Sequence, residues 1–184
     1  MPAEPRVWQR TDTVGTELVI PDGDNRVSGT AVVSGPKPYA TRWQVWLSDD
    51  HAVRALEVVC EGHGWRRELR LSSDGCRTQA TGDLDAPEPG LADPSRLAGA
   101  VIRLAASPVF LSWAMRALQL ESGEKTAPTA LVLTPSLTVV VGESRYQRLG
   151  DHRLRVSGDE PAATYDLDGD GMVTYQPGRL RGVR

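Results

Sequence analysis

Short stretches in which hydrophobic and polar residues alternate dominate the chain. In Trp65–Ser72, three apolar side chains share one face with Arg67, and the other face is polar. In Thr41–Leu47, Trp43 and Trp46 fall on opposite faces. A period of two over such lengths is typical of β-strands that bury one face of an antiparallel sheet.

Similar segments recur at intervals near ten residues and are separated by turns rich in glycine, proline and aspartate. This spacing predicts about a dozen strands and little helix. A chain of 184 residues is within the usual size of one domain. We therefore predict a single domain covering residues 1–184, mainly β, built as a sandwich, a barrel or a curled antiparallel sheet.

Leu97–Leu120 is the longest hydrophobic stretch, but Pro108, Arg103 and Arg116 interrupt it. A membrane-spanning helix needs about 20 apolar residues with few or no charges, so we predict a buried core segment and no integral membrane segment. Its second part, Val109–Leu120, has no glycine or proline, and its apolar residues recur at helical spacing. These residues are Phe110, Trp113, Ala114, Ala117 and Leu118. Taken alone, this pattern predicts a helix of three turns.

Charge and cysteine content narrow the class of protein. The net charge of −3 gives no positive field for nucleic acid. The first residues lack the basic and apolar regions of a secretory signal, so we predict a soluble, cytoplasmic protein. The two cysteines, Cys60 and Cys76, are then expected to be free thiols, and Cys60 follows two valines and is expected to be buried.

The sequence contains no strong catalytic or metal-binding motif. Asp166–Gly171 matches the first half of a calcium loop, but Pro177 occupies the position where such a loop needs a bidentate glutamate. The cluster is therefore interpreted as an acidic turn between two strands. The three histidines and two cysteines lack zinc-ligand spacing, and there is no Gly-x-Ser-x-Gly elbow. We predict a protein that is not an enzyme and has no metal or cofactor.

The five tryptophans favour a binding function. If the sheet curls, a tryptophan such as Trp46 can line a second surface near Arg42, Arg54 or Arg116. Aromatic surface beside guanidinium groups suits an amphipathic ligand. An ordinary exposed aromatic, or the interface of a homodimer, would explain Trp46 equally well.

Several segments together resemble a bacterial family described as putative glycolipid-binding proteins. The matching segments are Val101–Leu104, Ser107–Pro108, Leu111–Leu118, Leu133–Leu137, Ser144–Leu149 and Asp168–Gly178. Glu17, Tyr39 and Arg54 match more loosely. Four positions depart from the family's pattern: Val101 and Arg103 stand where it has acidic residues, Leu111 where it has asparagine, and Ala114 where it has proline.

The resemblance implies an incomplete antiparallel β-barrel, similar to bacterial lipoprotein-localisation carriers, with a cleft for lipid-like ligands. It also implies strand, loop and strand across Gly99–Leu120, and we favour this over the helix. The expected function is non-enzymatic binding of an amphipathic, lipid-like molecule, such as a glycolipid. The alternatives are an enzyme acting on such a molecule and an interaction module whose aromatics form a dimer face. The predicted ligand-binding residues are Trp46, Arg54, Ser107, Pro108, Trp113, Arg116, Tyr146 and Tyr175.

Overall fold

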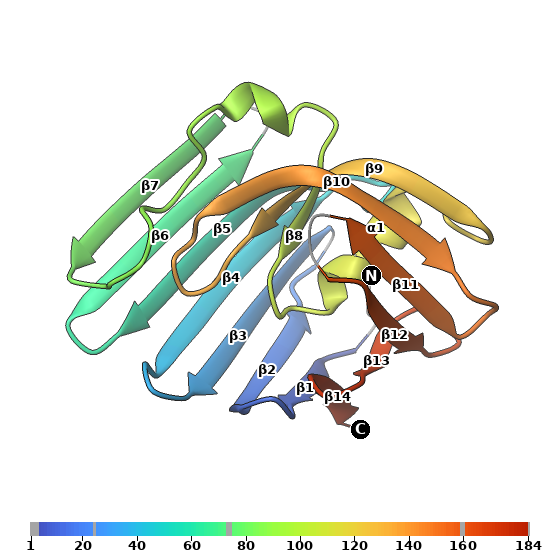
Figure 1. Cartoon of the computed structure of the whole chain (residues 1–184), viewed down its shortest axis with the longest axis horizontal. Helices are drawn as coiled ribbons and strands as arrows, with labels where there is room; N and C mark the ends of the chain where they lie inside the picture. The colour runs from blue at the N-terminus through green and yellow to red at the C-terminus, as the bar shows by residue number, and fades with distance from the viewer. Residues whose placement is uncertain (1–3, 24, 73–74, 159–160, 184) are drawn as a thin grey trace.

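The chain folds into one curled sheet of fourteen strands that does not close (Figure 1). The computed structural model describes residues 4–23, 25–72, 75–158 and 161–183. The strand order is β7-β6-β5-β4-β3-β2-β1-β14-β13-β12-β11-β10-β9-β8. All neighbouring strands pair antiparallel except β8 and β9, which are parallel. The prediction of a mainly β, curled antiparallel sheet is confirmed.

The first half of the sheet consists of seven strands in chain order. They are β1 (Arg6–Arg10), β2 (Val14–Pro21), β3 (Arg26–Ser34), β4 (Tyr39–Leu47), β5 (Val53–Gly62), β6 (Trp65–Ser72) and β7 (Gly75–Gly82). A 3-10 helix, η1 (Pro94–Leu97), and the α-helix α1 (Val109–Ala117) flank β8 (Val101–Leu104). The remaining strands are β9 (Glu124–Val132), β10 (Val139–Arg148), β11 (Arg153–Gly158), β12 (Ala163–Leu167), β13 (Val173–Gln176) and β14 (Leu180–Val183).

The alternation predicted for β4 and β6 is confirmed. On β4, Trp43, Val45 and Leu47 are buried on the concave side of the sheet, whereas Trp46 faces the other way and is half-buried. On β6, the residues at alternate positions from Trp65 to Leu71 are buried, and Arg67 is among them.

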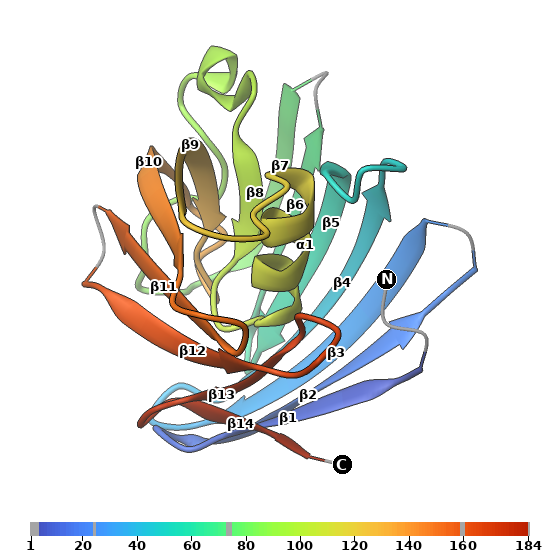
Figure 2. The ribbon, with the colours of Figure 1, turned by 90° about the vertical axis from the view of Figure 1, so that its right-hand side faces the viewer.

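The structure corrects the strand-loop-strand prediction for Gly99–Leu120. Its first part is the strand β8, but Val109–Ala117 forms α1, which lies in the hollow of the sheet (Figure 2). The seven residues from Val109 to Met115 are all buried, because the sheet surrounds the helix. The helical spacing of the apolar residues therefore predicted this segment correctly, and the expectation drawn from the resemblance was wrong.

An aromatic cluster fixes α1 against the sheet. The rings of Trp43, Phe110 and Trp113 meet edge to face, with centroids 4.9 to 6.2 Å apart. On the side of β13, the hydroxyl of Ser112 accepts a hydrogen bond from the backbone N–H of Val173 at 3.2 Å. The interior is consequently a packed core around α1 rather than an empty barrel.

Arg67 lies on the buried face of β6 and binds two segments that connect strands. Its guanidinium is buried and donates hydrogen bonds to four backbone carbonyls, those of Leu84, Ala86, Pro87 and Ser136. These carbonyls belong to the segment after β7 and to the turn between β9 and β10. Arg67 therefore holds two connecting segments over the sheet.

Two smaller predictions are also settled by the described residues. The acidic segment is a turn in which Asp168 Oδ1 accepts from the backbone N–H groups of Asp170 and Met172 at 3.0 and 2.9 Å. Cys60 and Cys76 are free, and Cys60 is buried beside the hydroxyl of Thr41, with burial raising the pKa of its thiol to about 11.

Across the described chain, none of the helices has the length and apolar character needed to cross a membrane.

Candidate ligand-binding site

Two adjoining pockets flank the segment that connects β8 to α1. The first, with a volume of about 110 Å³, is lined by Arg10, Arg103 and Arg179 and is called here the arginine pocket. The second, of about 30 Å³, contains Glu17 and is called the glutamate pocket. Both are bordered by Arg10, Leu180 and the connecting residues Leu104, Ala105, Ala106 and Ser107.

The connecting segment bends sharply. The N–H of Ala105 continues the pairing with β9 by donating to the carbonyl of Val132 at 2.8 Å. Ala106 then adopts a left-handed backbone with φ of 62°, a conformation that costs an L-residue about 1–2 kcal/mol. Pro108 starts the helix, where its fixed φ and missing N–H are tolerated. This bend brings the side chain of Ser107 to the border of both pockets.

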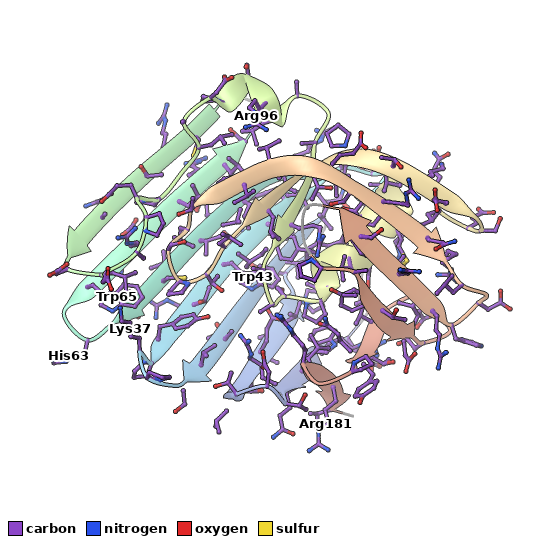
Figure 3. The ribbon with its side chains drawn as sticks, in the orientation of Figure 1. Lys37, Trp43, His63, Trp65, Arg96 and Arg181 are labelled. Atoms are coloured by element: carbon purple, nitrogen blue, oxygen red, sulfur yellow. The ribbon has the colours of Figure 1, made fainter. Side chains whose placement is uncertain are left out.

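Glu17 reaches the glutamate pocket because it lies on the concave face of β2. Its neighbours Thr16 and Leu18 are exposed, whereas Glu17 and Val19 are buried. The indole N–H of Trp43 donates to Oε1 of Glu17 at 3.0 Å. Trp43 extends across β3 to make this bond, and Gly29 leaves the space, since a Cβ there would lie 2.1 Å from the indole ring. Trp43 is thus shared by the aromatic cluster and the pocket, and Figure 3 shows it near the middle of the molecule.

The environment of Glu17 changes its acidity. Burial raises the pKa of its carboxyl to about 7, and the neighbouring Ser107 hydroxyl and Trp43 indole, which favour the carboxylate, offset part of this increase. Near neutral pH the group therefore exists both as an acid that can donate a proton and as a carboxylate that can accept hydrogen bonds.

Two polar atoms of this pocket are left without a partner. Among the described residues, neither Oε2 of Glu17 nor Oγ of Ser107 makes a hydrogen bond of normal geometry, although the Ser107 hydroxyl lies close enough to the Glu17 carboxylate to favour it, and both atoms are buried. Other polar groups around them are satisfied within the chain: the Trp8 indole donates to the carbonyl of Val173 at 2.8 Å, and the Tyr39 hydroxyl lies 3.2 Å from that of Thr134. Buried polar atoms are normally paired, so these two are open to a ligand or to water.

The arginine pocket has a different character. Arg10 binds Asp12 through two parallel hydrogen bonds of 3.0 and 2.8 Å, which raises the pKa of the guanidinium and lowers that of the carboxyl. Arg103 is buried, with only 8% of its surface exposed, and Arg179 is exposed. The arginine pocket therefore offers charge, and the glutamate pocket offers hydrogen-bonding groups among apolar side chains.

Comparison with known proteins identifies the family of this chain. A family described as "Putative glycolipid-binding" matches residues 6–182. The chain belongs to this family. It also resembles a crystal structure of a DUF1089 family protein from Pseudomonas aeruginosa, with a TM-score of 0.70, 20% sequence identity and coverage of 89% of each chain. At this identity the likeness supports the fold. No curated protein matches the chain.

In this member of the glycolipid-binding family, two of the eight predicted ligand-binding residues lie at the pockets. Ser107 borders both of them, and Pro108 borders the arginine pocket. Trp113 is buried in the aromatic cluster and borders a separate hollow of about 230 Å³ beside His51. Arg116 borders a more open hollow of about 480 Å³ and donates to the carbonyl of Asp170 at 3.0 Å.

The other four predicted residues are dispersed. Tyr146 is fully buried, and its hydroxyl lies 2.9 Å from that of Thr129. Trp46 is half-buried on the convex face of β4. Arg54 is exposed near the irregular register between β4 and β5. Tyr175 on β13 is 41% exposed. The structure therefore does not gather the eight residues into one site.

Sequence reasoning did not select Glu17, Trp43 or the three pocket arginines as ligand-binding residues. A signal for Glu17 was present, because the alternation in β2 places its carboxyl on the same face as Val19. Glu17 and Tyr39 were also among the positions that match the family loosely, and both line the glutamate pocket. No local pattern marks Arg10 and Arg179, which lie at opposite ends of the chain and meet only because β1 pairs with β14.

Proposed function

We propose that the protein binds an amphipathic, lipid-like ligand, and that it holds the polar end of this ligand at the glutamate and arginine pockets. A glycolipid is the ligand class that the family description names. The cytoplasmic location, the absence of catalysis and the homodimer that the sequence suggested stay predictions.

One observation carries this proposal: Oε2 of Glu17 and Oγ of Ser107 are buried, unpartnered and adjacent to an apolar surface. A ligand hydroxyl group could donate to the carboxylate and accept from the serine. Leaving a buried polar group unpaired costs about 1–3 kcal/mol, so a ligand that pairs both atoms gains that energy on binding. Sugars present hydroxyl groups beside apolar ring faces, which matches Glu17 next to Trp43 and Tyr39.

The size of the site limits what it can enclose. Ligand pockets for drug-sized molecules measure about 300–1,000 Å³. The arginine pocket has about 110 Å³ and the glutamate pocket about 30 Å³. The proposal therefore concerns one end of the ligand, of the size of a few hydroxyl groups.

A titration of the intrinsic tryptophan fluorescence with decyl maltoside, kept below its micelle concentration, tests the proposal. Trp43 touches Glu17, so ligand binding should change the emission. Glu17→Gln replaces the acceptor Oε2 by a donor and should weaken binding about tenfold, and Ser107→Ala should weaken it about fivefold. Glu88→Gln is the matched control, because Glu88 is exposed and lies outside both pockets.

The proposal is wrong if the wild-type protein binds neither decyl maltoside nor any other glycolipid or lipid analogue. If the wild type binds but Glu17→Gln and Ser107→Ala bind equally well, the ligand lies elsewhere. The hollow at Arg116 would then be the next region to test.

The raised pKa of Glu17 favours a second candidate function, an enzyme acting on a similar ligand. A carboxyl group with a pKa of about 7 is suited to donate and accept protons near neutral pH. Incubation with chromogenic glycosides and esters distinguishes the two functions. Product formation that is lost in Glu17→Gln would support the enzyme, whereas binding without turnover would support the carrier.

A further inference from the structure

The arginine pocket is positively charged although the protein as a whole is acidic. The net charge of the chain is −3. The pocket, by contrast, contains Arg10, Arg103 and Arg179 against the single carboxylate of Asp12. Both oxygens of Asp12 already accept hydrogen bonds from Arg10. Arg179 also lies close enough to Asp12 to lower the pKa of its carboxyl, so one carboxylate faces three arginines and the pocket keeps an excess of positive charge.

Arg103 is the most informative of the three. It lies on β8 and is 8% exposed. Within the described ranges, its guanidinium makes no ion pair and no hydrogen bond. Glu143 borders a small hollow on another side of Arg103, but its carboxylate makes no ion pair with it. Most of this side chain is withdrawn from water while its nitrogen atoms stay accessible, so the guanidinium can take up a counter-charge from a ligand.

The start of α1 adds to the positive potential. This nine-residue helix begins at Val109, directly after Pro108, which borders the pocket, and no side chain caps its first N–H groups. The N-terminal end of a helix carries a partial positive charge that favours anions. The hydroxyl of Ser107, which is 5% exposed and unpartnered, lies at the same border and can donate a further hydrogen bond.

We propose that the arginine pocket binds a negatively charged oxygen group, namely a phosphate, sulfate or carboxylate, in the head of an amphipathic ligand. The planar fork of Arg103 suits two oxygens of such a group, and Arg179, which is exposed, adds a second guanidinium to the lining of the pocket. This inference rests on the proposed function and adds to it the sign of the charge on the ligand head.

Glu17 is the charged group that opposes an anion from the adjoining pocket. Burial raises the pKa of its carboxyl to about 7, so a proton can remove this repulsion near neutral pH. Asp12 is the other carboxylate at the pocket, and it pairs with Arg10 and lies near Arg179, so its single charge is set against three arginines. An anion held between Arg103 and Arg179 therefore meets net attraction.

Isothermal titration with two ligands that share one alkyl chain tests this inference. Decyl phosphate should bind the wild-type protein at least tenfold more tightly than decyl maltoside, which is the range expected for one or two hydrogen bonds to a charged group. Arg103→Gln should remove this preference, because it should weaken the binding of decyl phosphate far more than that of decyl maltoside. Arg77→Gln is the control, because it removes one charge from an exposed residue of β7 that lines neither pocket.

Further arms identify the anion and its source. Decanoate and decyl sulfate replace the phosphate by the two other oxygen groups, and tight binding of any one of the three supports the inference. Added salt should weaken the binding of the anionic ligands and leave decyl maltoside unaffected. Inorganic phosphate alone should bind far more weakly than decyl phosphate, since it lacks the apolar part.

Each contrary result has a distinct meaning. Equal affinity for the anionic and neutral ligands, or a preference that survives in Arg103→Gln, overturns the anion site but leaves the proposed function intact. Inorganic phosphate that binds as tightly as decyl phosphate overturns the assignment to an amphipathic head group. Absence of binding by all the alkyl ligands overturns both proposals.

Discussion

Arg67 and Arg103 are two buried arginines of the same sheet, and they differ in what surrounds the guanidinium. Arg67 is 5% exposed and donates to four backbone carbonyls, whereas Arg103 is 8% exposed and has no hydrogen-bond partner within the described chain. Glu17 lies between these extremes, with Trp43 bound to one carboxyl oxygen and the other left open. A buried charge that the fold itself satisfies stabilises the structure, whereas one that the fold leaves open costs stability and is available to a ligand.

The largest expected effect is on Arg67. Arg67→Met keeps most of the side-chain volume but leaves the carbonyls of Ala86, Pro87 and Ser136 without their donor, whereas that of Leu84 keeps the N–H of Ala86. We expect a loss of about 3–5 kcal/mol in the free energy of unfolding, measured by urea denaturation. Arg70→Met is the control, because Arg70 lies on the same strand, is exposed and pairs only with Glu57 at the surface. Equal stability of the two variants would show that the carbonyls find water and that Arg67 is not structural.

Glu17 should produce a smaller effect that depends on pH. Its pKa is about 7 in the folded protein and about 4.5 when the chain is unfolded. Below pH 4.5 the carboxyl is protonated in both states and contributes nothing. As the pH rises from 4.5 to 7, the unfolded state loses its proton first, so the folded state is progressively disfavoured; above pH 7 the cost is constant at roughly 3 kcal/mol.

Glu17→Gln removes this titration. The difference in unfolding free energy between the variant and the wild type should therefore shift in favour of the variant by roughly 3 kcal/mol between pH 4.5 and pH 8, measured by urea denaturation at each pH. Glu88→Gln, which changes an exposed glutamate, should show no such shift. A difference that stays constant with pH would mean that the pKa of Glu17 is the same in the folded and the unfolded protein.

The elements of the fold were largely predictable because each depends on a local pattern. The alternation in β4 and β6 identified the buried faces, and the spacing of Phe110, Trp113 and Ala114 identified α1. The helix was nevertheless predicted as a strand, since we gave the family resemblance more weight than the period. The position of α1 inside the curl depends on contacts with Trp43, far away in sequence, and no local pattern contains that information.

The site was much less predictable, because its residues come together through contacts between segments that lie far apart in the sequence. Arg67 stands on the apolar face of β6 and Arg103 in the apolar strand β8, and nothing near them in the sequence shows that one meets four carbonyls and the other meets none. Arg10 and Arg179 share a pocket only through the pairing of β1 with β14. Trp46 and Arg54 were chosen for their residue types, but the alternation and the register of β4 and β5 place them away from both pockets.

Among these changes, the replacement of Arg103 should alter the free energy of unfolding least, in contrast to the replacement of Arg67. The guanidinium of Arg103 has no partner in the described structure, so Arg103→Met removes a partly desolvated charge without leaving any acceptor unpaired. We expect the unfolding free energy to stay the same or to rise by about 1 kcal/mol, measured by urea denaturation beside Arg67→Met. A loss comparable to that of Arg67→Met would mean that Arg103 already has a partner within the protein. In that case the positive charge of the pocket would be a structural requirement rather than a group reserved for a ligand.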